Sequence, residues 1–471
     1  MSPWKITSVF ASVIACLTVV SFVFPKDGIT VGEHTFCLPS IQDLTEANTA
    51  SNTNIDIGQA KKIEIPKEIT ELSDSIAFFQ NNLENSNLRF WLPDSNYFND
   101  FWTNAEKASS SDRVIRIMHY GDSQIEMDRI SYQLRSYMQQ HFGGGGPGML
   151  PFRTIIASST VSQSASGSLT HLASFGDSTV VRSSGNYGPM MQCFRMTGSA
   201  TASVKASSSS KTESRFKNFS RIRLVYNDRK GNLKATLTEK KKNKYSTSYT
   251  SGKTGVGSML WTLGTEASSF SISVTGNADL YCITVDNGPG VAVDNIPMRG
   301  CSGSQFTTVN KDLLTQSYAQ LDVGMIILQF GGNSVPYLKT EKQISNYCKT
   351  IGKQIDYIHQ CCPKAKILFI GPSDMSTSVK GKLQTYPMLP TLNDSLRVTA
   401  NRHGAAFWSI YQAMGGWNSM LAWKKQGLSG SDYIHFTPKG AVKMGEYLST
   451  AFDENYRLFT MKRRLNARKK Y

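Results

Sequence analysis

The chain has 471 residues, enough for two or three domains, and its 40% hydrophobic and 18% charged residues are those of an ordinary globular protein. The formal net charge of +16 favours an anionic partner, but the basic residues are scattered and accompany no zinc finger or aromatic RNA-binding motif. Sequence-specific nucleic-acid binding is therefore not expected. The eight cysteines have no CxxC spacing, which argues against a metal site.

The first segment predicts membrane attachment. Lys5 precedes an uncharged apolar run over residues 6–24, close to the roughly 20 residues that span a bilayer, and no clear cleavage site of small residues follows. We expect an uncleaved signal-anchor over 1–25, which exports the rest of the chain to the periplasm or cell envelope. A cleaved signal peptide and lipidation of Cys16 are the alternatives. Residues 26–74 are polar and weakly patterned, and we interpret them as a tether.

An alternation of strands and helices then begins. A short apolar strand over 114–118 runs into the turn Gly121-Asp122-Ser123, and apolar residues at helical spacing continue to Phe142. Four glycines and a proline stop this helix. Residues 75–151 are therefore interpreted as the first part of an α/β domain.

The composition changes over residues 152–285. Serine and threonine become dense, the predicted strands are short and alternating, and no long helical stripe appears. We interpret this segment as an inserted antiparallel β-sandwich, which serves either to bind glycan or to wall the active site. Cys193 and Cys282 fall within it and can pair, because an exported protein permits disulfides.

The α/β pattern resumes over residues 286–471. Continuous apolar runs are typical of strands buried on both faces, and three occur, at 323–330, 365–370 and 405–410. Helical stripes separate these runs, and a last helix begins near Pro438 and runs toward Phe452. Such alternation predicts a parallel, doubly wound sheet with helices on both faces. Ligands of these sheets bind at the carboxyl ends of the strands, so residues that follow the strands are candidates for a site.

Two places carry residues suited to nucleophilic catalysis. Ser123 lies at a strand-to-helix turn, where free backbone N–H groups can hold an oxyanion, although a serine there can equally be a helix N-cap. Near the C-terminus, Asp432 and His435 stand three residues apart, so that one turn can bring a carboxylate to an imidazole base. A histidine near a helix start with a surface aspartate beside it is the structural alternative.

Two further residues follow strands or turns at the same predicted edge. Asn333, in Gly331-Gly332-Asn333, has a side-chain amide that can donate to an oxyanion. Gly300 ends a predicted turn over 294–300 and can offer a bare N–H there. Taken alone, each is an ordinary loop residue.

Together these pieces resemble the GDSL/SGNH hydrolase family in residue type and in order. The resemblance implies Ser123 as the nucleophile, His435 as the general base and acid, and Asp432 as its orienting carboxylate. It implies an oxyanion hole made by the N–H groups of Ser123 and Gly300 and by the side chain of Asn333. A flavodoxin-like three-layer α/β/α fold that needs no metal or other cofactor is implied as well.

The segment IRIMHYGDSQIEMDRISYQLRSYMQQHFGGGGPGML also resembles peptidoglycan O-acetylesterases of this family, which carry a β-sandwich inserted in the same interval. One departure is Ser334, where the family more commonly has aspartate after Gly-Gly-Asn. The resemblance implies a serine esterase that removes O-acetyl groups from a cell-wall or extracellular glycan, peptidoglycan before others. An acyltransferase with the same triad, a lipid esterase and a glycan-binding protein with relic catalytic blocks are the alternatives.

Overall fold

The structure is a computed structural model that describes residues 29–31, 34–36, 72–176, 180, 182, 185–239 and 246–468. The signal-anchor predicted over 1–25 and most of the predicted tether lie outside these residues. The chain divides into two compact units at Asp56. In the first, β1 (Ile29–Val31) and β2 (His34–Phe36) pair as antiparallel strands within the segment interpreted as a tether.

The second unit is built on a parallel sheet, to which five strands of its described residues belong. They lie in the order β12 (Gly290–Pro297), β3 (Val114–Gly121), β13 (Val323–Gln329), β14 (Lys366–Gly371) and β17 (Ala406–Ser409). All four pairings are parallel. The second strand in the chain lies outside the first, which is the flavodoxin-like order. The prediction of a parallel doubly wound sheet is thus confirmed.

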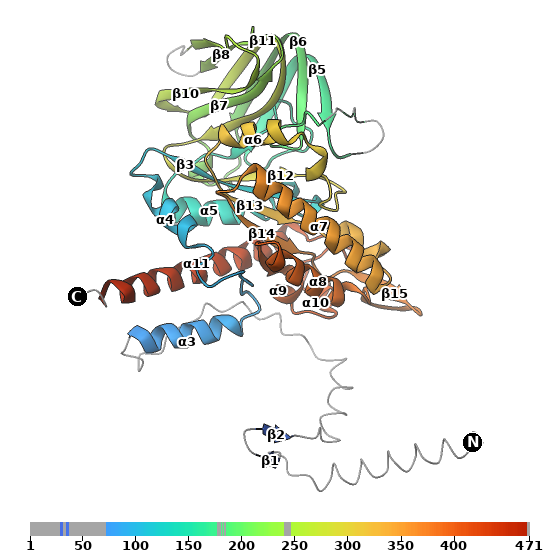
Figure 1. Cartoon of the computed structure of the whole chain (residues 1–471). Coiled ribbons are helices and arrows are strands. Elements are labelled where there is room, and N and C mark those ends of the chain that lie inside the picture. Colours follow the sequence, from blue (N-terminus) through green and yellow to red (C-terminus); the bar gives the residue numbers. More distant parts are fainter. Residues whose placement is uncertain are drawn as a thin grey trace. The chain divides into compact units, whose positions relative to one another are not determined.

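Helices cover both faces of this sheet (Figure 1). One layer consists of α4 (Asn99–Ala108), α5 (Ser131–Phe142) and α11 (Pro438–Arg468), and α3 (Leu72–Glu84) packs along α11. The other layer consists of α6 (Lys311–Ala319), α7 (Glu341–Cys361) and α8 (Leu389–Arg402). Two short helices, α9 (Ile410–Met414) and α10 (Ser419–Lys425), and the hairpin β15 (Ser376–Val379) and β16 (Lys382–Thr385) follow the last strands.

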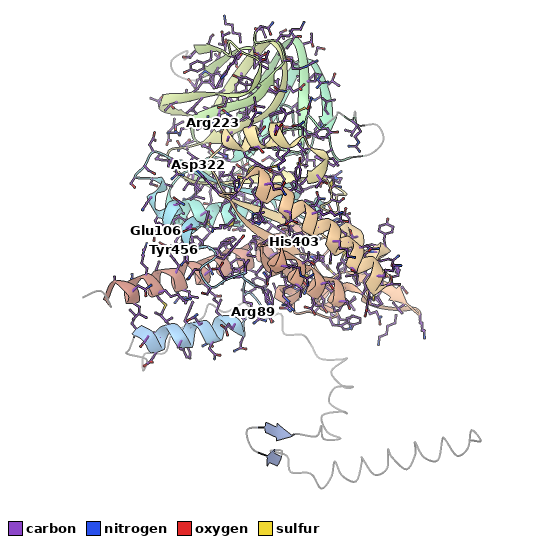
Figure 2. The ribbon with its side chains drawn as sticks, in the orientation of Figure 1. Arg89, Glu106, Arg223, Asp322, His403 and Tyr456 are labelled. Carbon is purple, nitrogen blue, oxygen red and sulfur yellow. The ribbon has the colours of Figure 1, made fainter. Side chains whose placement is uncertain are left out.

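The C-terminal helix α11 is longer than the sequence indicated. It was expected to run toward Phe452, and it continues to Arg468. Its second half is held by α4, where Glu106 accepts hydrogen bonds from Tyr456 at 2.8 Å and from Nη2 of Arg463 at 2.9 Å (Figure 2). A partner helix therefore supports the basic end of α11.

An antiparallel sheet is inserted between α5 and β12. It contains β4 (Gly148–Leu150), β5 (Val161–Ala173), β6 (Gln192–Ala206), β7 (Phe219–Asp228), β8 (Lys234–Glu239), β9 (Ser246–Thr250), β10 (Gly255–Ala267) and β11 (Ser269–Asp286). The first half of β11 pairs with β6 and β8, and its second half pairs with β7 and β4. The sheet therefore folds over a shared apolar core. The thiols of Cys193 and Cys282 are both free and buried, so the disulfide considered between them is not formed.

Arg116, on β3, joins the two sheets. Its guanidinium donates to Asp294 of β12 at 2.8 and 2.6 Å and to Asp286, the last residue of β11, at 2.8 Å. Asp294 also accepts from the backbone N–H of Met149 in β4 at 2.8 Å. Burial lowers the pKa of Arg116, but the two carboxylates raise it more, so the guanidinium stays charged. One guanidinium thus binds two carboxylates at this junction.

Candidate active site

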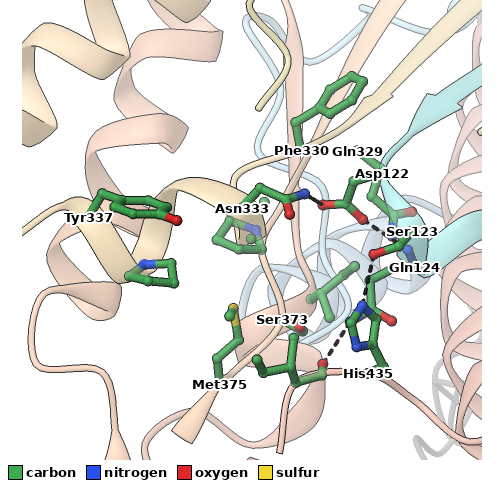
Figure 3. Close-up of a pocket in the computed structure, with 16 residues that line it drawn as sticks. Asp122, Ser123, Gln124, Gln329, Phe330, Asn333, Tyr337, Ser373, Met375 and His435 are labelled. Carbon is green, nitrogen blue, oxygen red and sulfur yellow. Dashed lines mark hydrogen bonds between the residues drawn. The ribbon is translucent and has the colours of Figure 1, made fainter. Parts of the chain in front are cut away.

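A cavity of about 190 Å³ lies at the carboxyl edge of the parallel sheet (Figure 3). Its walls come from the ends of β3, β13, β14 and β17 and from the loop before α11. Ser123, Asn333 and His435 all line it. Three of the residues selected from the sequence therefore meet at the edge where a doubly wound sheet binds its ligands.

Asp122, and not Ser123, caps the turn that follows β3. Its carboxylate accepts the backbone N–H of Gln124 at 2.9 Å and opens a short 3-10 helix, η2 (Ser123–Asp128). Because the cap is supplied by its neighbour, the hydroxyl of Ser123 is free for another partner. The helix is kinked at Met127, and α5 begins only after η2 has ended. Ser123 therefore opens a 3-10 turn, and not the long helix that the sequence indicated.

The structure brings Ser123 and His435 together across 312 positions of sequence. Ser123 Oγ and His435 Nε2 are 2.8 Å apart, and His435 Nδ1 and Asp432 Oδ2 are 2.7 Å apart. With its Nδ1–H donated to the carboxylate, a neutral imidazole accepts the serine hydroxyl at Nε2. This is the arrangement in which a serine can be activated as a nucleophile.

Asp432 is fixed by its own loop. Its Oδ1 accepts the backbone N–H groups of Ile434 and His435, each at 3.1 Å. Partial burial raises the pKa of Asp432, but the hydrogen bond from the His435 side chain and the two backbone N–H groups lower it more, so the pKa lies below its ordinary value. An ionised carboxylate at this place stabilises an imidazolium when the histidine takes up a proton.

Asn333 directs its amide toward the nucleophile turn. Nδ2 donates to the carbonyl of Cys301 at 3.0 Å and to Oδ2 of Asp122 at 3.3 Å. Burial raises the pKa of Asp122 to about 6, although the N–H of Gln124 and the charge of His435 lower it. The amide is thus held beside Ser123 by two acceptors, of which the carboxylate makes the longer bond.

Gly300 lies in the turn that follows β12, with a φ of +75°. It is exposed and does not line the cavity, and its part in an oxyanion hole remains a prediction. A second glycine of this turn, Gly303, was missed. A Cβ added there would lie 2.8 Å from Cγ of Phe330, a residue of the cavity wall, so Gly303 brings backbone close to that wall.

Two side chains that the sequence did not single out hold the histidine loop. Gln124 donates Nε2–H to the carbonyl of Ile434 at 2.8 Å and accepts the N–H of Phe436 at 3.4 Å, so it binds on both sides of His435. Arg129 donates to the carbonyl of Phe436 at 3.5 Å. A polar residue after the nucleophile was visible in the sequence, but its partners more than 300 positions away were not.

No group of three or more His, Cys, Asp or Glu side chains is arranged to hold a metal ion in the part of the chain that the structure describes. Within the same residues, no helix combines the length and the apolar character needed to cross a membrane. The predicted anchor over 1–25 lies outside them.

The sequence model of the GDSL-like Lipase/Acylhydrolase family matches residues 276–442. The matched range contains Asn333, Asp432 and His435, and Ser123 precedes it, on the other side of the inserted sheet. Among curated protein sequences, none matches this chain.

Two solved structures were compared with the chain, and one of them shares its fold. One described as "Peptidoglycan O-acetylesterase in action, 5 min" aligns over 76% of this chain and 96% of its own, with a TM-score of 0.62 and 21% identity. A family two carbohydrate esterase from Cellvibrio japonicus aligns over 63% of this chain and 99% of its own, with 8% identity and a TM-score of 0.25. The second score is too low to carry an argument, whereas the first shows a common fold.

Residues 276–442 are thus similar to the GDSL-like Lipase/Acylhydrolase family, and the fold is shared with a solved peptidoglycan O-acetylesterase. These findings support a carboxylic ester hydrolase, with the family match confined to residues 276–442.

Proposed function

We propose that this protein removes O-acetyl groups from a cell-wall or extracellular glycan, with peptidoglycan as the favoured substrate. The observation that carries the proposal is the line of hydrogen bonds from Ser123 through His435 to Asp432 beside a small cavity. At about 190 Å³, this cavity is smaller than the roughly 300–1,000 Å³ of pockets that enclose drug-sized ligands, and it suits a short acyl group. The fold shared with a peptidoglycan O-acetylesterase supports the choice of glycan.

In the proposed reaction, Ser123 Oγ attacks the acetyl carbonyl carbon while His435 Nε2 takes the hydroxyl proton. The N–H groups of Ser123 and Gly300 bind the oxyanion. Asn333 joins them by giving up its 3.3 Å hydrogen bond to Asp122 and donating to the oxyanion instead. Each donor lowers the barrier by roughly 3 kcal/mol.

His435 then gives its proton to the departing sugar oxygen, and the C–O bond breaks to leave acetyl-Ser123. A water, deprotonated by His435, attacks the acetyl carbon. Acetate leaves, the proton returns to Ser123 Oγ, and the resting state is restored.

The direct test is acetate release from purified O-acetylated peptidoglycan. We expect release by the parent protein and none above background by Ser123→Ala, while Ser110→Ala, at an exposed serine on the other side of β3 in sequence, keeps the parental rate. Release by Ser123→Ala at the parental rate contradicts the proposal. A free sugar acceptor added to the reaction becomes acetylated only if the enzyme is a transferase.

We also infer that the protein works outside the cytoplasm, held by the apolar segment over 1–25. Cell fractionation of the full chain should place it in the membrane fraction with its hydrolase part exposed to added protease, and deletion of 1–25 should leave it inside the cell. Full-length protein recovered in the cytosol contradicts this inference.

A further inference from the structure

Tyr337 is an exposed aromatic side chain at the edge of the candidate active site. Its exposed fraction is 76%, whereas the other large hydrophobic side chains classed as exposed in the described residues reach 51% at most. It nevertheless lines the same cavity as Ser123 and His435. A side chain that borders a cavity and faces solvent lies on the rim of that cavity.

The hydrogen bonds and ring contacts of the described residues do not account for this position. Among the described residues, the side chain of Tyr337 takes part in no hydrogen bond and no ring contact, so its exposure brings no evident gain in folding stability. Exposed apolar side chains that stand singly on a surface need no explanation, but those at the mouth of a pocket are frequent ligand contacts.

The backbone holds this ring at a fixed place. Tyr337 ends the 3-10 helix η5 (Gly332–Tyr337), which follows β13 and contains Asn333. The N–H of Leu338 donates to the carbonyls of Ser334 and Val335 at 3.2 and 3.3 Å, and Pro336 restricts the turn further. Figure 3 shows Tyr337 across the pocket from Ser123, with Asn333 between them.

The size of the cavity says which part of a substrate reaches the rim. A space of about 190 Å³ accepts an acetyl group at the serine but not the alcohol that carries it. Phe330 and Met375 contribute apolar wall to this space. The alcohol part of the ester must therefore extend over the rim, where an aromatic face can pack against the C–H face of a sugar ring.

We propose that Tyr337 is the stacking platform for the sugar ring that carries the ester, and that it selects glycan acetates over acetates of small aliphatic alcohols. This inference rests on the proposed function and adds the residue that recognises the alcohol side of the substrate. The aromatic ring is the proposed recognising group, and the variant Tyr337→Phe separates its part from that of the hydroxyl.

The test compares Tyr337→Ala and Tyr337→Phe on O-acetylated peptidoglycan and on triacetin, whose glycerol offers no ring to stack. For Tyr337→Ala we expect kcat/KM on the glycan to fall roughly tenfold, mainly through KM, and to change less than roughly twofold on triacetin. Tyr337→Phe should stay near the parent on both. Trp417→Ala, which removes an aromatic side chain that is 42% exposed and lies outside the cavity lining, serves as the matched control.

Equal losses of kcat/KM on both substrates for Tyr337→Ala would mean that Tyr337 supports the fold of the site. An unchanged kcat/KM on the glycan would contradict the proposal that Tyr337 binds the sugar ring. Aromatic leaving groups such as 4-nitrophenyl can themselves stack on the ring, so 4-nitrophenyl acetate should show an intermediate loss. If the parent releases no acetate from peptidoglycan but hydrolyses triacetin, the proposed substrate is wrong. Glucose pentaacetate then replaces the glycan, and a selective loss on it by Tyr337→Ala still decides for or against the platform.

Discussion

Strand β3 carries a polar cluster at each end, and the two clusters differ in their access to water. Near its start, Arg116 and its two aspartate partners are at most 6% exposed, and they join the parallel sheet to the inserted one. Beyond its end, Ser123 is hydrogen-bonded to His435. The side chain of His435 is 40% exposed, and that of its partner Asp432 is 45% exposed. The same strand thus leads from a buried ion network to an exposed network of hydrogen bonds.

This difference in exposure predicts which cluster matters for folding stability and which for the reaction. A buried ion pair contributes little net free energy when complete, but the loss of one partner leaves an uncompensated charge and costs much. An exposed pair contributes little to folding and is reachable by substrate and water. Substitutions at the buried end should therefore lower stability, and substitutions at the exposed end should lower the rate.

The largest expected effect is on the rate, at the exposed end. His435→Ala removes the proposed base, and we expect kcat to fall by about 10⁴-fold or more, equivalent to about 5.5 kcal/mol of barrier. The free energy of unfolding in urea should change by less than about 1 kcal/mol, because the imidazole is exposed. A loss of unfolding free energy as large as the increase in the barrier would contradict the distinction between the exposed and the buried cluster.

At the buried end, Arg116→Met should destabilise the fold by roughly 3–5 kcal/mol, because Asp286 and Asp294 stay buried and lose the guanidinium that binds them both. Protein that remains folded should keep its kcat. Arg113→Met is the matched control, since Arg113 on the segment before β3 pairs with Asp322 at 2.7 Å with 44% and 40% of the two side chains exposed. Its loss should cost less than about 1 kcal/mol in the same urea titration.

Asp122 is an exception at the exposed end of β3, because its carboxylate is buried and should therefore affect stability. Burial raises its pKa to about 6 in the folded protein, above the ordinary 3.8. Between these pH values the folded state holds the proton more tightly than the unfolded state, so the contribution of this group to stability falls as pH rises from about 4 to 6 and stays lost above.

Asp122→Asn removes this titration. The stability of the variant minus that of the parent should grow by up to about 3 kcal/mol between pH 4 and pH 7, as measured by urea unfolding at each pH. A difference that stays flat with pH would show that the carboxylate is not held in the environment described.

The smallest expected effect comes from the residue that holds the histidine loop. Gln124→Ala removes two hydrogen bonds on either side of His435 without touching the imidazole. We expect kcat to fall roughly tenfold with KM unchanged, because misplacement of a base slows chemistry more than binding. Gln140→Ala, at an exposed glutamine of α5, should leave both constants unchanged, and a rise in KM alone for Gln124→Ala would contradict the positioning role.

Much of the fold was readable in the sequence. The apolar runs that became β13, β14 and β17 were recognised because strands of a parallel sheet are buried on both faces and need no polar alternation. The serine-rich interval was recognised as an insertion because helical stripes stop and resume around it. By contrast, the second half of β12 falls within the turn predicted over 294–300, because Asp294 and Asn295 interrupt the apolar pattern there and find partners only in the folded molecule.

Local sequence therefore determined most of the strands and helices of the α/β part, and it marked Ser123, Asn333, Asp432 and His435 as side chains of the right chemical type. The tertiary structure alone decided that the serine and the imidazole lie 2.8 Å apart, that Asp122 frees the serine by taking over the cap, and that Gln124 ties the two distant segments together. The physical reason is that periodicity and composition act over a few residues along the chain, whereas a hydrogen bond across some three hundred residues depends on how the strands are ordered in the sheet.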